Sequence, residues 1–288
     1  MDYHMCFAMS SRLAAFFTRN YLVRTISLLL LTYCYTGNSY GQQQVEAKVK
    51  TYLILLGGQS NMVGYGSTGD AQYKEFTENV SYINLGFTKD LLPAENRFGP
   101  EVSLGDELSM AFPNNNFIFL KYAIDGSSLL DWAPNYSSKR AEITEHPEFG
   151  NIYQRFITKV DGILATQEVE ICCMLWMQGE RDAKIPVAGE EYEENLISLI
   201  NALRRDTESE NLDFLIAKIN PPIEGWTALE RVRDAQKSIT ETVTNTYLIE
   251  TDDLEKISDS LHYSSKGQIE LGKRFANKII NILNIDGE

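Results

Sequence analysis

Cysteine and histidine are scarce in this chain of 288 residues, which holds four cysteines and three histidines. Cys6 and Cys34 lie within the first 41 residues, whereas Cys172 and Cys173 are adjacent in an apolar run. Adjacent residues on a strand face opposite sides, so this pair cannot form a disulfide framework, and neither cysteine has metal-ligand spacing. We interpret Cys172 and Cys173 as buried structural residues.

Basic residues are also few: 26 Lys and Arg oppose 40 Asp and Glu, which gives a net charge of −14 at pH 7. Such a surface repels nucleic acid and anionic membranes. The sequence lacks the Gly-Lys-Ser/Thr of a phosphate-binding loop and the Asp/Asn pattern of an EF-hand. We therefore expect a protein that acts on a neutral or small substrate, with no nucleic-acid partner. No metal or organic cofactor is expected, although calcium held in some other way stays open.

No apolar run reaches the roughly 20 residues of a confident membrane span. Arg12, Arg19 and Arg24 precede a short apolar run at residues 26–35, and small and polar residues follow up to Gly41. This pattern predicts a signal peptide over residues 1–41 and a secreted or periplasmic protein with no membrane association after cleavage. Removing it takes away three arginines and one aspartate, which lowers the charge to −16. A retained N-terminal anchor is the alternative.

The remaining chain reads as one domain over residues 50–284, because short apolar runs alternate there with amphipathic stretches. Strands are predicted at Thr51–Leu56, Val80–Leu85, Asn116–Ala123, Glu170–Met177, Asp213–Ile219 and Thr246–Glu250. Helices are predicted at Glu101–Ala111, Ile152–Thr166, Gly189–Thr207, Ala228–Val243 and Ser264–Asn284. Strand–helix alternation predicts an α/β fold with a central parallel sheet and helices on both faces. In such sheets the site lies at the carboxyl ends of the strands.

Ser60 follows the first predicted strand directly, in Gly57-Gly58-Gln59-Ser60-Asn61-Met62. The two glycines permit a tight turn that brings Ser60 to the edge of the sheet. A helix starting there would favour negative charge developing beside the serine. This pattern makes Ser60 a candidate nucleophile, and the alternative is a serine that only caps a helix.

A serine nucleophile needs a general base, which is usually histidine. His4 lies in the predicted leader, and His146 precedes a proline in a polar loop, where a solvated residue is expected. His262 lies between the last strand and the last helix, three positions after Asp259. A carboxylate at that spacing can fix the imidazole tautomer. The alternative is a surface aspartate beside a histidine at a helix start.

Together these blocks are similar to the SGNH (GDSL-like) hydrolase superfamily. The block Trp176-Met177-Gln178-Gly179-Glu180-Arg181-Asp182 resembles one branch, the sialate O-acetylesterase-like domain that includes acetylxylan esterases of carbohydrate esterase family six. The resemblance covers about residues 50–280 and implies a flavodoxin-like, three-layer α/β/α fold. It implies a triad of Ser60, Asp259 and His262. It also implies an oxyanion hole from Ser60, Gly99 and Gln178, although the superfamily's Gly-x-Asn-Asp block is absent here.

Weaker assignments concern the residues around the site. Gln59, Asn61 and Trp132 are assigned to substrate binding, Trp132 because it lies in a matching Gly-x-Ser-Leu…Trp stretch; the alternative is a loop that its ring packs. Asn61 is also expected to fix the nucleophile loop. Glu180 and Asp182 could form a glycosidase carboxylate pair, but we favour a structural role.

The expected function is a serine esterase that removes O-acetyl groups from a sugar or polysaccharide. The acetyl group is implied by the family alone, and xylan, pectin-type and sialic acid esters stay open. A lipid or thioester hydrolase of the same superfamily is one alternative. A non-catalytic carbohydrate-binding domain is the other.

Overall fold

The computed structural model describes residues 49–68, 76–85 and 97–285. The leader predicted at residues 1–41 lies outside these ranges. The described part of the chain forms a six-stranded sheet in the order β2-β3-β1-β4-β5-β6, and every pair is parallel. The strands are β1 (Thr51–Gly58), β2 (Val80–Asn84), β3 (Asn116–Ala123), β4 (Glu170–Met177), β5 (Asp213–Ala217) and β6 (Thr246–Ile249).

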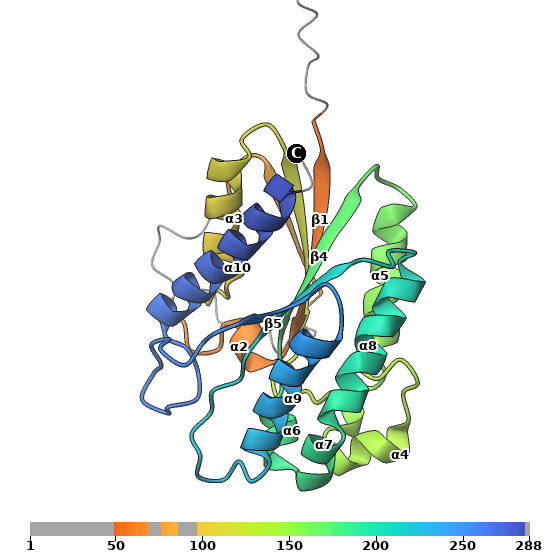
Figure 1. Ribbon diagram of the computed structural model, residues 1–288, viewed down its shortest axis with the longest axis vertical. Helices are drawn as coiled ribbons and strands as arrows, with labels where there is room; N and C mark the ends of the chain where they lie inside the picture. Colours follow the sequence, from red (N-terminus) through yellow and green to blue (C-terminus); the bar gives the residue numbers. More distant parts are fainter. Residues whose placement is uncertain (1–48, 69–75, 86–96, 286–288) are drawn as a thin grey trace, which may run out of the picture. The chain divides into compact units, whose positions relative to one another are not determined.

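Helices cover both faces of this sheet, which confirms the predicted three-layer α/β/α architecture (Figure 1). On one face α3 (Glu101–Ala111) packs against α10 (Ser265–Ile285). On the other lie α5 (Ile152–Leu164), α8 (Tyr192–Asp206) and α9 (Leu229–Thr242). Short helices follow the carboxyl ends of the strands: α2 (Ser60–Val63), α4 (Ser138–Ala141), α6 (Glu180–Lys184) and α7 (Pro186–Glu190).

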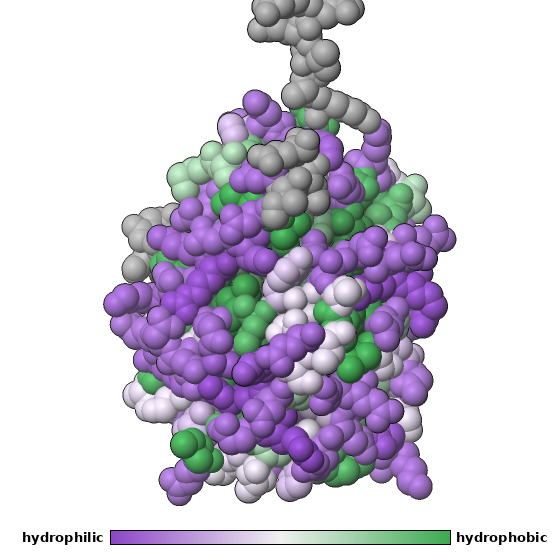
Figure 2. Space-filling model, in the orientation of Figure 1, coloured by the Kyte–Doolittle hydropathy of each residue, from purple (hydrophilic) through white to green (hydrophobic). Residues whose placement is uncertain are grey.

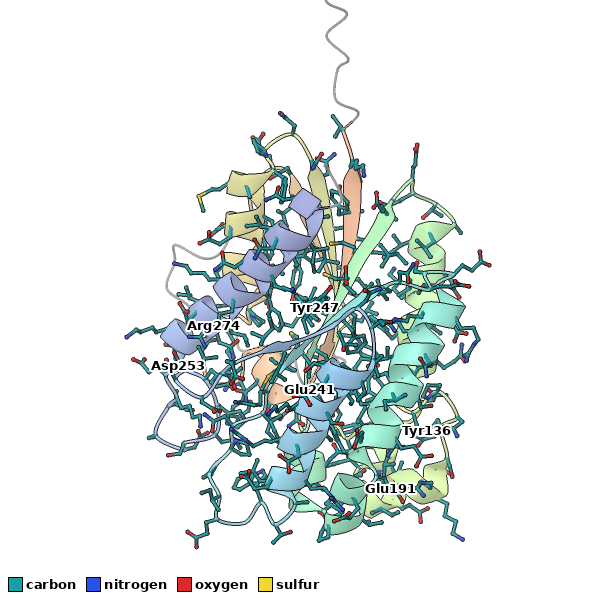
Figure 3. The ribbon with its side chains drawn as sticks, viewed as in Figure 1. Tyr136, Glu191, Glu241, Tyr247, Asp253 and Arg274 are labelled. Atoms are coloured by element: carbon teal, nitrogen blue, oxygen red, sulfur yellow. The ribbon has the colours of Figure 1, made fainter. Side chains whose placement is uncertain are left out.

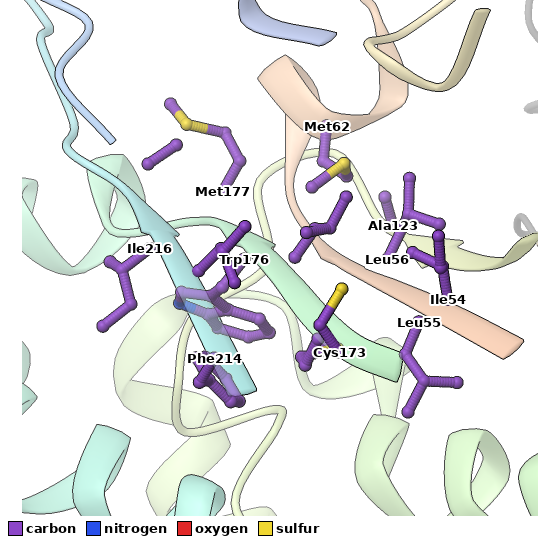
Figure 4. Packing of buried hydrophobic residues seen from close by; sticks show 14 of the residues in the cluster. Ile54, Leu55, Leu56, Met62, Ala123, Cys173, Trp176, Met177, Phe214 and Ile216 are labelled. Atoms are coloured by element: carbon purple, nitrogen blue, oxygen red, sulfur yellow. The ribbon is translucent and has the colours of Figure 1, made fainter. Parts of the chain in front are cut away.

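The central strands are apolar nearly throughout because helices cover both of their faces. Residues 53–56 of β1 are completely buried, and so are Trp176 of β4 and Ile216 of β5. Figure 4 shows Ile54, Leu55 and Leu56 of β1 with Trp176 of β4 and Ile216 of β5, and Phe214 lies beside Trp176. Cys172 and Cys173 are buried free thiols, as predicted.

The element boundaries agree closely with the predicted ranges, and β3, β4 and α3 match them residue for residue. The helix predicted over residues 189–207 is divided: its first two residues end the short helix α7, which Pro186 starts. α8 then begins at Tyr192.

The face of the molecule drawn in Figure 2 is mostly hydrophilic, with apolar residues in small separate areas. Across the described ranges, no helix combines the length and apolar character that crossing a membrane requires.

Candidate active site

Ser60 is placed by a turn that the two glycines at the end of β1 make possible. Gly58 has φ +150°, and a Cβ there would lie 2.0 Å from the Met177 carbonyl oxygen on neighbouring β4. Only glycine allows this close approach. α2 begins at Ser60, which is 3% exposed. Its N–H therefore belongs to a first helical turn, where backbone donors have no partner within the helix.

His262 and Asp259 form the predicted pair on the loop between β6 and α10. Asp259 Oδ2 lies 2.7 Å from His262 Nδ1, and Asp259 Oδ1 accepts the Leu261 and His262 N–H groups at 2.9 Å each. Burial pushes the pKa of Asp259 upward, but the hydrogen bonds from the His262 backbone and ring outweigh it, so this pKa is lower than usual. An ionised Asp259 holds the proton on Nδ1 and leaves Nε2 as the acceptor.

The loop that carries His262 is also fixed to α10. Arg274 donates to both carboxylate oxygens of Asp253 at 2.7 Å and to the Glu250 carbonyl oxygen at 2.8 Å. Figure 3 shows Arg274 on α10 next to Asp253. The hydrogen bonds from Arg274 lower the pKa of Asp253 to about 2.

Asn61 joins the nucleophile turn to the histidine loop across about 200 residues of sequence. Its side chain accepts the Tyr263 N–H at 3.0 Å and lies 3.3 Å from the Leu261 carbonyl oxygen, to which it donates. Gln268 of α10 donates to the Asn61 carbonyl oxygen at 2.9 Å. Asn61 is 1% exposed, and both polar atoms of its side-chain amide form hydrogen bonds within the protein. It therefore fixes the loop, and the prediction that it binds substrate is wrong.

Ser60 and His262 line the same pocket of about 120 Å³. The other lining residues are Gln59, Asp125, Gly126, Glu180, Arg181, Lys184, Trp226 and Leu261. In the described structure no hydrogen bond joins Ser60 Oγ to the imidazole. Catalytic hydrogen bonds are often long without substrate and tighten when substrate binds. The structure thus brings the predicted nucleophile and base together.

Gln178 does not supply the predicted oxyanion donor. Its amide Nε2 donates to the Ser127 carbonyl oxygen at 3.0 Å, to Asp182 Oδ2 and to Gln59 Oε1 at 3.2 Å. Gln178 is completely buried, so this amide nitrogen is committed to the protein interior. Gln59 lines the pocket, but its Oε1 also accepts the N–H groups of Gly179 and Arg181. Gln59 therefore orients the β4–α6 turn.

Gly99 is the second oxyanion residue that the structure contradicts. Its N–H donates to Glu101 Oε1 at 3.0 Å. A Cβ on Gly99 would lie 2.5 Å from the Met62 carbonyl oxygen, which places this residue toward the end of α2 and not at Ser60. Gly126, after β3, lines the pocket instead, with φ +71°. None of the described residues accepts a hydrogen bond from the Gly126 N–H.

Trp132 cannot bind substrate as predicted, because its side chain is completely buried. It packs edge to face against Trp176, Phe156 and Tyr122, with ring centroids 5.1–5.8 Å apart. The alternative, a loop packed by this ring, is the correct one. Trp226, in the loop after β5, is the tryptophan that lines the pocket. It was missed because an isolated tryptophan in a loop has no periodic pattern.

Glu180 and Asp182 hold loops, as expected, and point to different partners. Glu180 Oε1 accepts from Asn61 Nδ2 at 2.8 Å, and Asp182 accepts from Ser128 Oγ at 2.9 Å and from the Leu129 N–H. Burial raises the pKa of both carboxyl groups, and it raises the pKa of Asp182 to about 6. Asp182 does not line the pocket. The two carboxylates therefore do not face one substrate as a glycosidase pair would.

The rim of the pocket carries charge of both signs. Lys184 Nζ lies 4.4 Å from the centre of the Trp226 ring, whose Nε1 donates to the Glu180 carbonyl oxygen at 3.1 Å. Arg181 is held by the Thr144 carbonyl oxygen and by Glu145. Asp125 is exposed at the same rim. Within the described part of the chain, no group of three or more His, Cys, Asp or Glu could hold a metal.

His146 lies in a loop, as predicted, but it is half-buried and not fully solvated. Its ring stacks on Phe149 and its Nδ1 lies 3.0 Å from Glu148, while 35% of its side chain is exposed. It does not line the pocket. A Cβ built on Gly126 would lie 3.7 Å from His146 Nε2, so His146 packs next to the pocket without lining it. Of the described histidines, His262 is the one that lines the pocket.

Comparison with known proteins agrees with this site. The family described as "Carbohydrate esterase, sialic acid-specific acetylesterase" matches residues 50–281. A probable carbohydrate esterase of Arabidopsis thaliana is 24% identical over 244 residues, which cover 80% of this chain and 90% of that protein. The crystal structure of that plant protein gives a TM-score of 0.64 at 19% identity and covers 80% of this chain and 98% of its own.

The crystal structure of NanS gives a TM-score of 0.63 at 12% identity and covers 82% of this chain and 98% of its own. At these identities the structural likeness shows a shared fold. The family match extends over most of the described domain. The chain therefore belongs to the carbohydrate esterase family of sialic acid-specific acetylesterases.

Proposed function

We propose that this carbohydrate acetylesterase works through an acyl-enzyme on Ser60, with His262 as general base and Asp259 as its partner. One observation carries the proposal. A small pocket contains both Ser60 and a histidine whose Nδ1 is held 2.7 Å from a carboxylate. That is the arrangement by which a serine hydroxyl is activated for acyl transfer.

The reaction starts when His262 Nε2 takes the Ser60 hydroxyl proton as Oγ attacks the ester carbonyl carbon. The tetrahedral intermediate then expels the sugar oxygen, which takes that proton from His262. Acetyl-Ser60 remains. His262 next takes a proton from water, whose oxygen attacks the acetyl carbon. Acetate leaves and the proton returns to Ser60 Oγ. Asp259 stabilises the imidazolium in both halves of the cycle.

The negative oxygen of the intermediate is assigned to two backbone donors, the Ser60 N–H and the Gly126 N–H. Both residues line the pocket, and Ser60 opens α2. Backbone donors that are fixed before the reaction cost no reorganisation when charge develops. Gly126 takes the place of Gly99 and Gln178 in the predicted oxyanion hole, because the N–H groups of those two residues already donate to oxygens of the protein.

The size of the pocket supports a short acyl group. Pockets for drug-sized ligands measure about 300–1,000 Å³, whereas this one measures about 120 Å³. The sugar is assigned to the rim that Trp226 and Lys184 form, where an aromatic surface and nitrogen donors meet. Trp226→Leu should raise KM for acetylated sugars and leave KM for ethyl acetate within about twofold, because the small ethoxy leaving group does not reach that rim.

The test is acetate release from a panel of acetylated xylan, pectin-type and sialic acid substrates. Ser60→Ala should abolish release while the protein stays folded, and His262→Ala should nearly abolish it. His146→Ala is the control and should change activity far less than His262→Ala, because His146 does not line the pocket even though its ring lies next to Gly126. Loss of activity in His146→Ala with retention in His262→Ala would overturn the base assignment.

A p-nitrophenyl ester series tests the acyl group. We expect kcat/KM to fall from the C2 to the C8 ester, because the pocket is small. Activity that rises with chain length would favour a lipid or thioester hydrolase. Binding of sugars with no release of acetate from any substrate would favour a carbohydrate-binding domain.

We also propose that the protein is exported after removal of residues 1–41, on the basis of the arginines and the short apolar run in that segment. N-terminal sequencing of the protein from the periplasm or culture medium tests this. A mature chain that starts near Gln42 is expected, and a full-length chain in the membrane fraction would support the anchor instead.

A further inference from the structure

The ring of Tyr65 contacts the imidazole of His262 from the nucleophile turn. The two ring centres are 4.4 Å apart, and their planes are inclined by 38°. The Arg97 guanidinium carbon lies 4.5 Å from the centre of the same tyrosine ring. Tyr65 does not line the pocket. It therefore touches the base from outside the lining of this pocket.

The backbone holds Tyr65 in a fixed position relative to the nucleophile. The N–H groups of Gly64 and Tyr65 both donate to the Ser60 carbonyl oxygen at 3.0 Å. The next residue, Gly66, lies so close to the histidine loop that a Cβ there would be 3.0 Å from His262 Cβ. One short segment thus carries the nucleophile at its start and packs against the base at its end.

Other charged groups also face His262, from its own loop, from α6 and from the segment after β3. Asp259 is on its own loop, and Glu180 of α6, with Lys256 near it, acts on the imidazole through space. Asp125, Arg181 and Lys184 lie on the pocket walls. Tyr65 differs from these charged groups because it is uncharged and its aromatic ring packs against the imidazole ring of His262.

We propose that Tyr65 is a positioning residue for the acyl-transfer reaction, whose ring fixes the plane of the His262 imidazole and favours the imidazolium that forms as Ser60 loses its proton. The face of an aromatic ring attracts a cation through its quadrupole. Arg97 opposes this effect, because its positive charge is held on the same ring and repels the imidazolium. The inference rests on the proposed function, since it requires His262 to act as the base.

The test compares Tyr65→Leu, Tyr65→Phe and Arg97→Met by the pH dependence of kcat/KM for p-nitrophenyl acetate. Tyr65→Leu should lower kcat about 5- to 10-fold with KM unchanged, the size expected for one cation–π contact. The acid-side midpoint of its profile should move to lower pH, because an imidazolium without the ring loses its proton more easily. Tyr65→Phe keeps the ring face and should restore most of kcat. Arg97→Met should move the midpoint to higher pH.

Tyr247→Leu is the matched control. Lys278 Nζ lies 3.5 Å from the Tyr247 ring centre on β6, so the substitution also removes a tyrosine under a cation, but outside the pocket lining. The acid-side midpoint of the kcat/KM profile of Tyr247→Leu should equal that of the wild type.

Midpoints that stay fixed in Tyr65→Leu, or that shift in the same direction in Tyr65→Leu and Arg97→Met, would overturn the inference. A rise in KM with kcat unchanged would do so too, because it indicates substrate binding. An active Ser60→Ala variant would instead refute the proposed function itself, so the two failures are distinguishable.

Discussion

Asp259→Asn is the substitution that isolates the role of the carboxylate in the proposed triad. Asp259 Oδ1 accepts two backbone N–H groups at 2.9 Å, and an asparagine oxygen can accept both of them. The change therefore keeps the loop and alters only the atom that faces His262 Nδ1, now 2.7 Å from Oδ2. An amide NH₂ at that position can only donate. Nδ1 must then accept, which moves the imidazole proton to Nε2, the atom that should receive the Ser60 proton.

The expected loss follows from this tautomer change. A serine triad whose aspartate is replaced by asparagine loses about 10⁴ in kcat in the best-studied protease. Here 39% of the Asp259 side chain is exposed, and solvent weakens the electrostatic part of its effect. We therefore expect a loss of about 10³ in kcat, or about 4 kcal/mol of transition-state stabilisation.

The assay is kcat for acetate release, measured together with thermal unfolding. Asp259→Asn should unfold close to the wild-type temperature, since the loop bonds persist. Asp259→Ala should lower both kcat and the melting temperature, because it also removes the two acceptors of the backbone N–H groups. An Asp259→Asn variant that keeps more than about a tenth of wild-type kcat would refute the tautomer argument.

Three further predictions concern stability. Trp132→Ala should lower the free energy of unfolding by about 3–5 kcal/mol in denaturant titrations, because it empties a buried site. Burial raises the pKa of Asp131 to about 7, so the folded state keeps a proton that the unfolded chain releases near pH 4, and stability falls as pH rises between these values. Asp131→Asn should flatten that fall in melting temperature, and an unchanged slope would contradict the assignment. Arg274→Met should make the protein unfold at higher pH during acidification, because Asp253 then loses the partner that lowers its pKa to about 2.

The elements of the fold could be predicted because their signals are local. The apolar runs that become β3 and β4 are bounded by polar residues, and Pro100 stands directly before α3. The neighbours of each strand could not be predicted. β3 lies beside β1, and this pairing brings Gly126 to the nucleophile, but nothing in residues 116–126 specifies which strand they join.

The chemical groups of the site were predictable where their spacing is short. Asp259 and His262 are three residues apart, and the distance between them follows from one turn of chain. Whether a backbone or amide N–H is available as an oxyanion donor depends on the hydrogen bonds of the folded chain, which the residue type does not reveal. Gly99 and Gln178 both carry N–H donors. In the folded protein the Gly99 N–H donates to Glu101, and the Gln178 side-chain amide donates to the Ser127 carbonyl oxygen. Tyr65 was missed because its partner His262 lies far away in the sequence, and Trp226 because an isolated tryptophan in a loop has no periodic pattern.

Covalent labelling with a small alkyl fluorophosphonate tests the central claim most directly. The reagent reacts with a serine that an adjacent base has activated. We expect one adduct, located by peptide mass mapping on Ser60, with labelling lost in His262→Ala and retained in His146→Ala. An adduct on a different residue, or labelling of Ser60 at an undiminished rate without His262, would contradict the account.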